Sequence, residues 1–514
     1  MIVFNDFLKW LSIDLSIKLT ISLISLLVAY FLLEKFKGGK RIPGPKGLPL
    51  VGIAFSIKKE KMHLELANYA RKYGNLCRFN LMGSDIVLVS GLKLIHEVFV
   101  TKQDGFSSRY LSNRLGILYK KEPGITAMND DEKFRELKKI CLKSFKHYGD
   151  GMETVESLTM RSINKFFTYL SNANGKAVDI NDKIQYLLAD IVYSMLLNQE
   201  LSEEEISQIT KMSIQFVEVT FGSKALLLEL FPWLKYFGYK AYKKICDYER
   251  NVCAFWNKVI DQRFLMNQDE KNKDEISGAI DSMYSQLMKS SFQYSRASFC
   301  KTLQSIILAG FSTTSSSMYN FLPILLNHPQ IEKRIFQEVS EAVGHSRMPC
   351  LEDKKNMPYS EACVLELLRY TTVVPFALPH ETDRDMDLDG YQLKKGTQIW
   401  PNIWGLHHDE EIWGDPWNFR PERFLNEEGK VVDTGHYLRK HLLPFGAGRR
   451  ICLAKPMAKN RLFLFITGII QNYKVEPEKE NKLPEYDARK FLFMGVVVSS
   501  PYKAKFIRRE QKSD

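Results

Sequence analysis

The sequence has few cysteines for its length, and their spacing is irregular. Eight cysteines are scattered over 514 residues, with no C-x-x-C pair among them. Disulfide frameworks and structural zinc sites need several cysteines at short intervals, so we expect neither. The pattern is typical of a protein in a reducing compartment.

The sequence also lacks internal repeats, low-complexity tracts and long Gly/Ser linkers. Length alone would allow several domains of ~150 residues, but nothing divides the chain beyond its amino-terminal region. Hydrophobic residues make up 45% and aromatic residues 12%, which is enough to bury a large core and to line a ligand cavity. We therefore expect one large domain over residues 53–514.

Long uncharged apolar runs are rare, and the clearest covers residues 19–33. With Ile17 and Lys18 ahead of it, this run makes a helix of about 17 residues that spans ~25 Å, just enough for a thin endoplasmic reticulum bilayer. Basic residues follow it at Lys35, Lys37, Lys40 and Arg41, so the positive-inside rule places the main body in the cytosol. A cleaved signal peptide is the alternative, but no A-x-A-like site follows. We predict a single-pass membrane anchor over residues 1–36.

The predicted anchor is followed by a basic stretch rich in proline and glycine, residues 37–52. It contains Pro43-Gly44-Pro45-Lys46-Gly47-Leu48-Pro49, which cannot be helical because proline lacks the backbone N–H. Such a stretch predicts a stiff hinge.

The motif that says most about chemistry is Pro444-Phe445-Gly446-Ala447-Gly448-Arg449-Arg450-Ile451-Cys452. A metal-binding cysteine must be a thiolate, which nearby cations and backbone N–H groups stabilise. The glycines allow those N–H groups to approach the sulfur closely. A lone cysteine in such a loop suits a haem iron better than zinc. From the residues alone, a buried cysteine after a glycine turn is the alternative.

This loop resembles the haem-thiolate signature of the cytochrome P450 superfamily, F-x-x-G-x-R-x-C-x-G. Phe445, Gly448, Arg450 and Cys452 match it, whereas Ala454 replaces the last glycine. The resemblance implies haem b, with Cys452 as the axial ligand of its iron. It also implies a mainly α-helical cytochrome P450 fold with small β-sheets, and it extends over about residues 17–507.

A charged triad is implied by the same resemblance. Glu366 and Arg369 lie three residues apart in a run of helix formers, so both charges fall on one helical face and can pair. A solvated surface pair is the alternative. In the family, an E-x-x-R helix interlocks with a P-E-R-F loop, here residues 421–424, which implies that Arg423 joins the pair and supports the cysteine loop.

Residues 303–319 resemble the oxygen-activating helix of the family, A/G-G-x-D/E-T-T/S. Ala309, Gly310, Thr313 and Thr314 match, but Ser312 occupies the position of the acid. The resemblance implies that Ala309 and Gly310 border the haem and that the Thr313 hydroxyl delivers protons. Ser312 can pass a proton along but cannot hold a charge. A kinked soluble helix is the alternative from the residues alone.

Three further cations resemble partners of the haem propionates, namely Arg109, Lys138 and His380. Together with Arg450 they would neutralise two carboxylates in a mostly apolar pocket. Lys138 lies in a helix where the family has W-x-x-x-R, and Phe134 replaces that tryptophan. For Arg109 and Lys138 taken singly, an exposed charge is the alternative.

The formal net charge is +12, and basic residues crowd the segments expected on the cysteine side of the haem. They are Lys133, Arg135, Lys138, Lys139, Lys143, Lys146, Lys440, Arg449, Arg450, Lys455, Lys459 and Arg461. No interleaved aromatics or nucleic-acid motif accompany them, so we expect no nucleic-acid partner. An acidic electron donor fits better. The resemblance implies NADPH–cytochrome P450 reductase, with cytochrome b5 as a further candidate.

The expected substrate walls are almost entirely apolar and include Phe216, Ile306, Val374, Phe376 and Val496. They predict a lipophilic substrate. The sequence is most similar to the animal drug-metabolising and steroid 17α-hydroxylase group, which implies an NADPH-dependent monooxygenase acting on a steroid or xenobiotic. The alternatives are a haem-thiolate isomerase or peroxide-dependent enzyme, and a haem- or steroid-binding protein without turnover.

Overall fold

The computed structural model describes residues 17, 20, 22, 25, 41–146, 153–264, 278–479 and 482–510. The predicted anchor lies outside these residues, apart from the four single positions. Within the described ranges, no helix is both long and apolar enough to cross a membrane. Residues 41–52 form no helix, and they lie against the first strand, where the Arg78 backbone N–H donates to the Pro43 carbonyl at 2.8 Å.

Helices dominate the described chain, which confirms the mainly α fold class. The α-helices are α3 Met62–Tyr73, α4 Leu92–His96, α5 Gln103–Phe106, α6 Asn113–Tyr119, α7 Glu132–Lys146, α8 Glu153–Asn172, α9 Asn181–Leu197, α10 Glu203–Phe221, α11 Ser223–Leu230, α12 Lys240–Phe264, α13 Ala279–Met288, α14 Arg296–Asn327, α15 Pro329–Ala342, α16 Pro358–Thr371, α17 Ile403–His407, α18 Glu410–Trp413, α19 Tyr437–His441 and α20 Lys455–Asn472. Short turns of other helix types are η1 Lys59–Lys61, η2 Glu97–Thr101, η3 Pro232–Phe237, η4 Leu351–Asn356, η5 Pro421–Phe424, η6 Gly448–Arg450 and η7 Ala488–Lys490.

The strands of the described ranges form one five-stranded sheet and three two-stranded sheets. The larger sheet has the order β1-β2-β7-β4-β3 and is antiparallel except where β2 pairs with β7. Its strands are β1 Leu76–Leu81, β2 Ser84–Val89, β3 Ser108–Arg109, β4 His380–Glu381 and β7 Gln398–Pro401. The small sheets pair β5 Met386–Leu388 with β6 Tyr391–Leu393, β8 Tyr473–Pro477 with β11 Ala504–Arg508, and β9 Leu492–Phe493 with β10 Val497–Val498.

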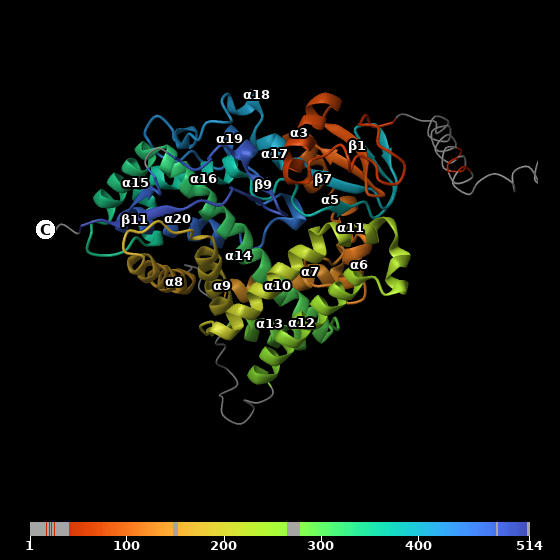
Figure 1. Ribbon diagram of the computed structural model, residues 1–514, viewed down its shortest axis with the longest axis horizontal. Helices are drawn as coiled ribbons and strands as arrows, with labels where there is room; N and C mark the ends of the chain where they lie inside the picture. The colour runs from red at the N-terminus through yellow and green to blue at the C-terminus, as the bar shows by residue number, and fades with distance from the viewer. Residues whose placement is uncertain are drawn as a thin grey trace, which may run out of the picture.

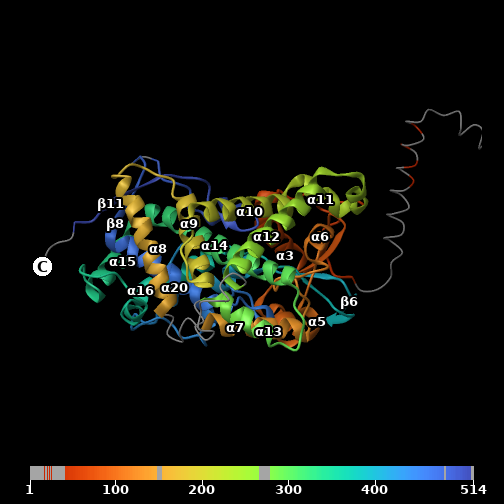
Figure 2. The ribbon, with the colours of Figure 1, turned by 90° about the horizontal axis from the view of Figure 1, so that it is seen from below.

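The long helix α14 runs through the middle of the helical body (Figure 1). Its 32 residues span ~48 Å, and it contacts α9, α12, α16 and α20. The Ser295 side chain caps its first turn by accepting from the Ser298 backbone N–H at 3.1 Å. The view from below shows α9 and α12 beside α14, with α20 on the side toward α8 and α16 (Figure 2). The main hydrophobic core surrounds α14, and the larger sheet with α3 packs its own smaller cores beside it.

Candidate functional site

The loop that carries Cys452 turns at two glycines in the left-handed region. Gly446 has φ +70° and Gly448 has φ +66°, a conformation that favours glycine. A Cβ on Gly448 would lie 1.6 Å from the Phe99 carbonyl oxygen, so no other residue fits there without displacing η2. The Cys452 backbone N–H then donates to the Phe445 carbonyl at 3.0 Å and closes the loop just before α20.

The thiol of Cys452 is accessible, although protein surrounds much of it. The residue is exposed, yet desolvation by the surrounding protein raises the pKa of its thiol, against opposing effects of the Ala454 backbone N–H and Lys455. The two observations agree if solvent reaches the sulfur from one side only. A bound metal cation would overcome the desolvation and stabilise the thiolate.

The pairing of β3 with β4 sets Arg109 directly opposite His380. The guanidinium of Arg109 donates through Nη1 to the Leu378 carbonyl at 2.7 Å, but its buried Nε has no hydrogen-bond partner. His380 Nδ1 lies 2.6 Å from the Phe106 carbonyl, so Nδ1 carries the proton, because a carbonyl only accepts.

Arg450 and Lys138 complete this cation cluster. Arg450 donates through Nε to the Ser107 carbonyl at 2.8 Å and through Nη2 to the Met128 carbonyl at 2.6 Å. Its guanidinium also lies 3.6 Å from the centre of the Phe134 ring, so the residue that replaces the family tryptophan stacks on the cation. Lys138 Nζ donates to the Arg449 carbonyl at 2.5 Å.

Burial disfavours the charged form of all four groups, and a positive neighbour adds to this effect for Arg109, His380 and Lys138. Burial lowers the pKa of Arg109 to about 9, with Arg450 as the second cause, and burial lowers that of Arg450 to about 10. The pKa of His380 falls well below its usual value through burial and Arg109, and that of Lys138 is lowered by burial and Arg450. Among the ion pairs of the described residues, none involves Arg109, Lys138 or Arg450. A cluster of this kind, with a free buried Nε, fits the two carboxylates of haem b.

The hydroxyl-rich segment of α14 is helical throughout. Ser312 Oγ donates to the Leu308 carbonyl at 2.6 Å, and Thr313 Oγ1 donates to the Ala309 carbonyl at 2.9 Å. Such bonds to the i−4 carbonyl bend helices slightly. In the middle of this largely buried helix, Ala309 is exposed. A Cβ on Gly310 would lie 2.9 Å from a methyl group of Val192, so this glycine permits close packing of α9 on α14. Its predicted place beside the haem stays a prediction.

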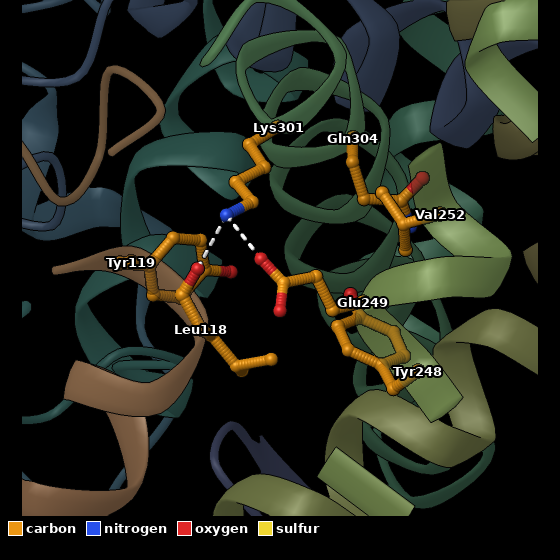
Figure 3. Close-up of a pocket in the computed structure, with 7 residues that line it drawn as sticks. All are labelled: Leu118, Tyr119, Tyr248, Glu249, Val252, Lys301 and Gln304. Carbon is orange, nitrogen blue, oxygen red and sulfur yellow. Dashed lines mark hydrogen bonds and ion pairs between the residues drawn. The ribbon is translucent and has the colours of Figure 1, made fainter. Parts of the chain in front are cut away.

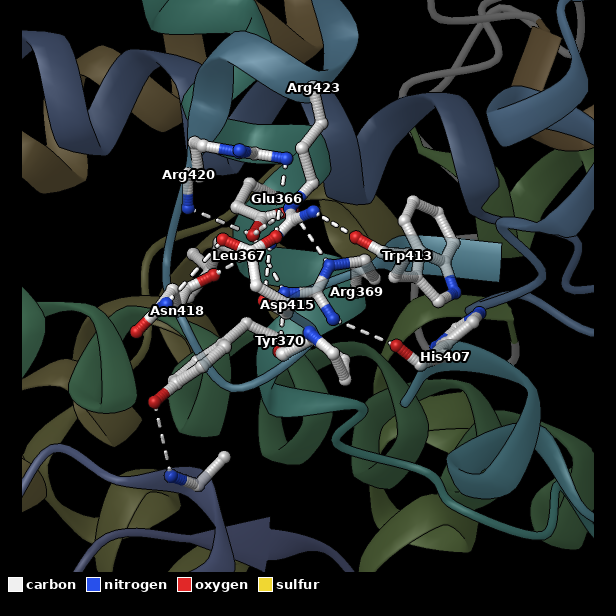
Figure 4. A network of polar contacts seen from close by, with 12 residues as sticks. Glu366, Leu367, Arg369, Tyr370, His407, Trp413, Asp415, Asn418, Arg420 and Arg423 are labelled. Carbon is white, nitrogen blue, oxygen red and sulfur yellow. Dashed lines mark hydrogen bonds and ion pairs between the residues drawn. The ribbon is translucent and has the colours of Figure 1, made fainter. Parts of the chain in front are cut away.

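Glu366, Arg369 and Arg423 form one buried network (Figure 4). Glu366 accepts from Arg369 Nε at 2.8 Å and Nη2 at 2.7 Å, and from Arg423 Nε at 3.3 Å. Both charges of the E-x-x-R pair are 0% exposed, which rules out the solvated surface pair. Arg369 Nη1 donates to the His407 carbonyl at 2.8 Å, and the His407 ring accepts from the Leu443 backbone N–H at 2.9 Å. The network therefore reaches the start of the cysteine loop.

The predicted substrate-wall residues fall into two groups. Phe376 packs against Phe493 with ring centres 6.0 Å apart, and Val374 and Val496 flank the hydrogen bond from the Val497 N–H to the Val373 carbonyl. Phe216 of α10 and Ile306 of α14 pack against the main core.

Six of the twelve residues predicted to form a basic surface are exposed, five are half-buried and Arg461 is buried. Arg135, Lys139, Lys143, Lys146, Lys440 and Lys455 are exposed. Arg461 was expected to extend this surface, yet it is only 2% exposed, because α20 turns it toward Met195 of α9. Sequence position in a basic region does not reveal which face of a buried helix a residue takes.

Some supporting contacts had no signal in the sequence. Arg449 pairs with Asp104 at 2.6 Å and with Asp130, and its backbone N–H donates to Gln103 Oε1 at 3.1 Å. These partners are more than 300 residues away in the chain, and no spacing rule joins them. They fasten the cysteine loop to the segment that begins at α5.

Comparisons with known proteins agree with this geometry. The chain is 27% identical over 505 residues to steroid 17-alpha-hydroxylase/17,20 lyase of Cavia porcellus, covering 95% of this chain and 97% of that one. It is 29% identical over 471 residues to cytochrome P450 2J1 of Oryctolagus cuniculus, covering 89% and 90%. It is 28% identical over 453 residues to cytochrome P450 1A2 of Rattus norvegicus, covering 84% and 86%.

The match to a family covers residues 42–506, which correspond to Cytochrome P450. Members of this family use haem b and take electrons from a redox partner such as NADPH–cytochrome P450 reductase. With the cysteine loop, the cation cluster and the buried triad on one fold, the chain belongs to the cytochrome P450 family and is a monooxygenase.

Proposed function

We propose that this enzyme uses electrons from NADPH to insert one oxygen atom of O2 into a lipophilic steroid or xenobiotic and reduces the other atom to water. The observation that supports the proposal best is the cation cluster of Arg109, Lys138, His380 and Arg450. Arg109, Lys138 and Arg450 gather positive charge beside an accessible cysteine, and among the described residues none of the three takes part in an ion pair. The pKa of the His380 ring is held well below its usual value by burial and Arg109, and this ring would gain its second proton when a carboxylate binds beside it. Buried cations bind a cofactor that carries acidic groups, and the two propionates of haem meet this requirement. A cofactor without acidic groups would leave the cations unpaired.

The Cys452 thiolate would bind the haem iron, and the cation cluster would hold the propionates. When bound, the haem supplies oxygen activation, which electron donation from a thiolate ligand promotes. Phe445 packs against the main core and shields the sulfur side. The buried triad positions the loop through His407 and touches neither haem nor substrate.

Thr313 and Ser312 are the proposed proton-handling residues. Both hydroxyl hydrogens are engaged by backbone carbonyls of α14, so each oxygen retains lone pairs that can accept a proton or a bond from water. Without a carboxylate at position 312, no side chain there stores a negative charge. Proton transfer therefore depends on reorientation of these hydroxyls and on water.

We propose that the predicted single-pass anchor attaches the enzyme to the endoplasmic reticulum membrane. Two groups of exposed apolar residues support this proposal. Leu48, Leu50 and Phe55 are 54–81% exposed, and Trp233, Tyr236 and Phe237 of η3 are 53–77% exposed. The two groups are near each other, because a Cβ on Gly83 would lie 3.9 Å from both Leu230 of α11 and Leu50. An exposed apolar patch of this kind favours contact with lipid.

A haem-thiolate isomerase or peroxide-dependent enzyme is the second candidate. Ser312 favours it, because a reaction that needs no protonation of reduced dioxygen can dispense with the acid.

Two measurements test the proposal. The carbon monoxide difference spectrum of the reduced holoenzyme is expected to show a thiolate-type band that Cys452→Ala abolishes. With NADPH and reductase, substrate-dependent product formation is expected from lipophilic compounds. Equal NADPH consumption with and without substrate, yielding only peroxide, would contradict monooxygenation while leaving haem binding intact.

A further inference from the structure

Two adjacent histidines, His407 and His408, lie at the end of α17 and differ in their hydrogen-bond partners. Both are buried, with 0% and 4% of the residue exposed. The partner of a ring nitrogen shows whether that nitrogen carries a proton, because a backbone carbonyl only accepts and a backbone N–H only donates. The protonation state of each ring can therefore be assigned from its neighbours.

The neighbours of His407 keep its ring neutral. Its Nε2 accepts from the Leu443 backbone N–H at 2.9 Å, so this nitrogen carries no proton. Its Nδ1 lies 2.9 Å from Thr372 Oγ1, whose own hydrogen goes to the Arg369 carbonyl at 2.6 Å, so Nδ1 is the donor. Burial, with Arg369 as the second cause, lowers the pKa of this ring to about 3, which agrees with the assignment.

The ring of His408 faces two carbonyls instead. Its Nδ1 lies 3.0 Å from the Trp404 carbonyl oxygen, and its Nε2 lies 3.0 Å from the Tyr370 carbonyl oxygen. Each contact is a hydrogen bond only if the nitrogen carries a hydrogen. Either neutral tautomer would leave one unprotonated nitrogen against a carbonyl oxygen, with lone pairs facing each other. Turning the ring over would place carbon atoms opposite both carbonyls and lose both hydrogen bonds.

Other neighbours of His408 also favour a positive charge. The indole rings of Trp404 and Trp417 are stacked on it, with ring centres 4.1 Å and 4.7 Å away, and the face of an indole attracts a cation. Tyr370 is the last residue but one of α16, so its carbonyl belongs to the negative end of that helix dipole. Two acceptors, two indole rings and one helix end therefore surround the ring.

Burial acts most strongly against a charge on His408. Burial, Arg369 and His407 lower the pKa of the ring, whereas the two hydrogen bonds to carbonyls raise it. Beyond the indoles lie Arg489, 5.0 Å from the centre of one indole ring, and His63, 4.4 Å from that of the other. None of these groups supplies the donor that a neutral His408 would need. The hydrogen-bond pattern therefore decides the protonation state.

Lys301 shows the same kinds of partner around another buried cation. Its ammonium donates to the Leu118 carbonyl at 2.5 Å and to Glu249 Oε1 at 2.6 Å, beside the small pocket between α6, α12 and α14 (Figure 3). It also lies 5.9 Å from the centre of the Tyr119 ring. One carbonyl, one aromatic ring and one carboxylate hold this cation. At His408 a second carbonyl and a second aromatic ring take the place of the carboxylate.

The position of α17 matters because this helix contacts both sides of the proposed site. His407 accepts from the start of the cysteine loop. The Trp404 backbone N–H donates at 3.1 Å to the carbonyl of Pro375, which lies between two predicted substrate-wall residues. His408 fastens the same helix to the end of α16 through Tyr370. A change in the His408 contacts would therefore reach the cysteine loop and the substrate wall together.

We propose that His408 is a buried imidazolium cation and a positioning residue, whose two N–H donors hold α17 so that the cysteine loop and the substrate wall keep their places. The proposal goes beyond the proposed function and does not depend on which molecule is oxidised. His408 takes no part in the oxygen chemistry itself.

NMR of holoenzyme labelled with 15N-histidine tests the charge directly. The reduced, carbon monoxide-bound form is used because it is diamagnetic. At about pH 8.5, two pH units above the ordinary pKa of histidine, an unperturbed ring is neutral and has one unprotonated nitrogen. We expect His408 to show two protonated nitrogens, and we expect this signal to vanish in His408→Arg and in His408→Gln. The variants are needed because His380 can also gain a second proton beside a carboxylate.

The same variants test the positioning role. His408→Arg keeps a planar cation with N–H donors, whereas His408→Gln keeps a polar side chain without a charge. In mild urea we expect the thiolate-type carbon monoxide spectrum to be lost about tenfold faster in His408→Gln and less than about threefold faster in His408→Arg, since charge-assisted hydrogen bonds are roughly twice as strong as neutral ones. His96→Gln makes the same change at an exposed residue of α4 and is expected to behave as the wild type.

Three results would overturn the proposal. The first is the absence of any histidine with two protonated nitrogens, and the second is such a signal that persists when His408 is replaced. The third is a loss of the spectrum in His408→Gln that is no faster than in His96→Gln. The wild type and His408→Gln suffice for all three results, so the proposal stays testable if His408→Arg does not fold. Product formation enters none of these measurements, so the proposed function is tested separately.

Discussion

Replacing Arg461 by methionine should make the protein more stable. Arg461 is 2% exposed, its Nε has no hydrogen-bond partner, and its Nη2 lies 3.8 Å from the Met195 sulfur, a weak acceptor. Burial lowers the pKa of this guanidinium from 12.5 to about 10. At 1.36 kcal/mol for each pKa unit, the folded state disfavours the charge by ~3 kcal/mol at neutral pH.

The sign follows from the direction of the shift. Because the pKa is lower in the folded state, the cost is present at all pH values below about 10 and disappears only as the pH rises toward 12.5. Methionine keeps an unbranched chain and carries no charge. Replacing a buried charge by an apolar residue of similar volume stabilises some proteins by ~1–4 kcal/mol, and we expect a gain of ~1–3 kcal/mol here.

Urea unfolding of haem-loaded protein, followed by circular dichroism at neutral pH, measures this gain. Arg369→Met is the matched control, because Arg369 is equally buried but donates to Glu366, His407 and Pro416. We expect that control to lose ~3–5 kcal/mol. If Arg461→Met is no more stable than the wild type at equal haem content, the reasoning is wrong, and an anion must neutralise Arg461.

Three further predictions concern the site. Gly448→Ala should abolish the thiolate-type carbon monoxide spectrum, because its Cβ would collide with the Phe99 carbonyl, whereas Gly446→Ala, with nothing within 4 Å, should cost only ~1 kcal/mol and keep the spectrum; equal effects would contradict this. Ser312→Asp should raise the fraction of NADPH electrons recovered in product, and unchanged or lower coupling would refute that role for the missing carboxylate. His407 is fully buried, and burial lowers its pKa from 6.5 to about 3, so its contribution to stability is present above pH 6.5 and is lost progressively toward pH 3. Urea unfolding at several pH values should show that His407→Gln reduces the acid-side loss of unfolding free energy by up to ~4 kcal/mol. If the free energy of unfolding depends on pH as in the wild type, His407 is not the group responsible.

Local motifs predicted which residues carry the chemistry of the site better than they predicted the distant contacts that hold those residues in place. The cysteine loop, the E-x-x-R pair and the hydroxyl-rich helix are short patterns whose spacing determines their geometry, so they could be read from the sequence. The fold class followed from the same resemblance. Contacts such as Gln103 with Arg449, or Phe99 with Gly448, join segments hundreds of residues apart, and nothing in local sequence announces them.

The sequence also could not predict how deeply individual side chains are buried. Arg461 and Arg369 are both arginines on helices, yet one is an unpaired interior charge and the other donates to several acceptors. Gly310 matched a motif, but the atom that its missing Cβ would meet belongs to α9.

The acceptors of the triad suggest how this region tolerates change. Apart from Glu366, Arg369 and Arg423 donate largely to backbone carbonyls between residues 407 and 418, at His407, Trp413, Asp415, Pro416 and Asn418. Every amino acid has the same backbone carbonyl, so the side chains of this irregular segment can vary while the two arginines keep their hydrogen bonds. The segment does not tolerate a change of length in the same way, because inserting or deleting one residue would move the carbonyls out of reach of the arginines. In diverging relatives, substitutions should therefore accumulate here far more freely than insertions or deletions.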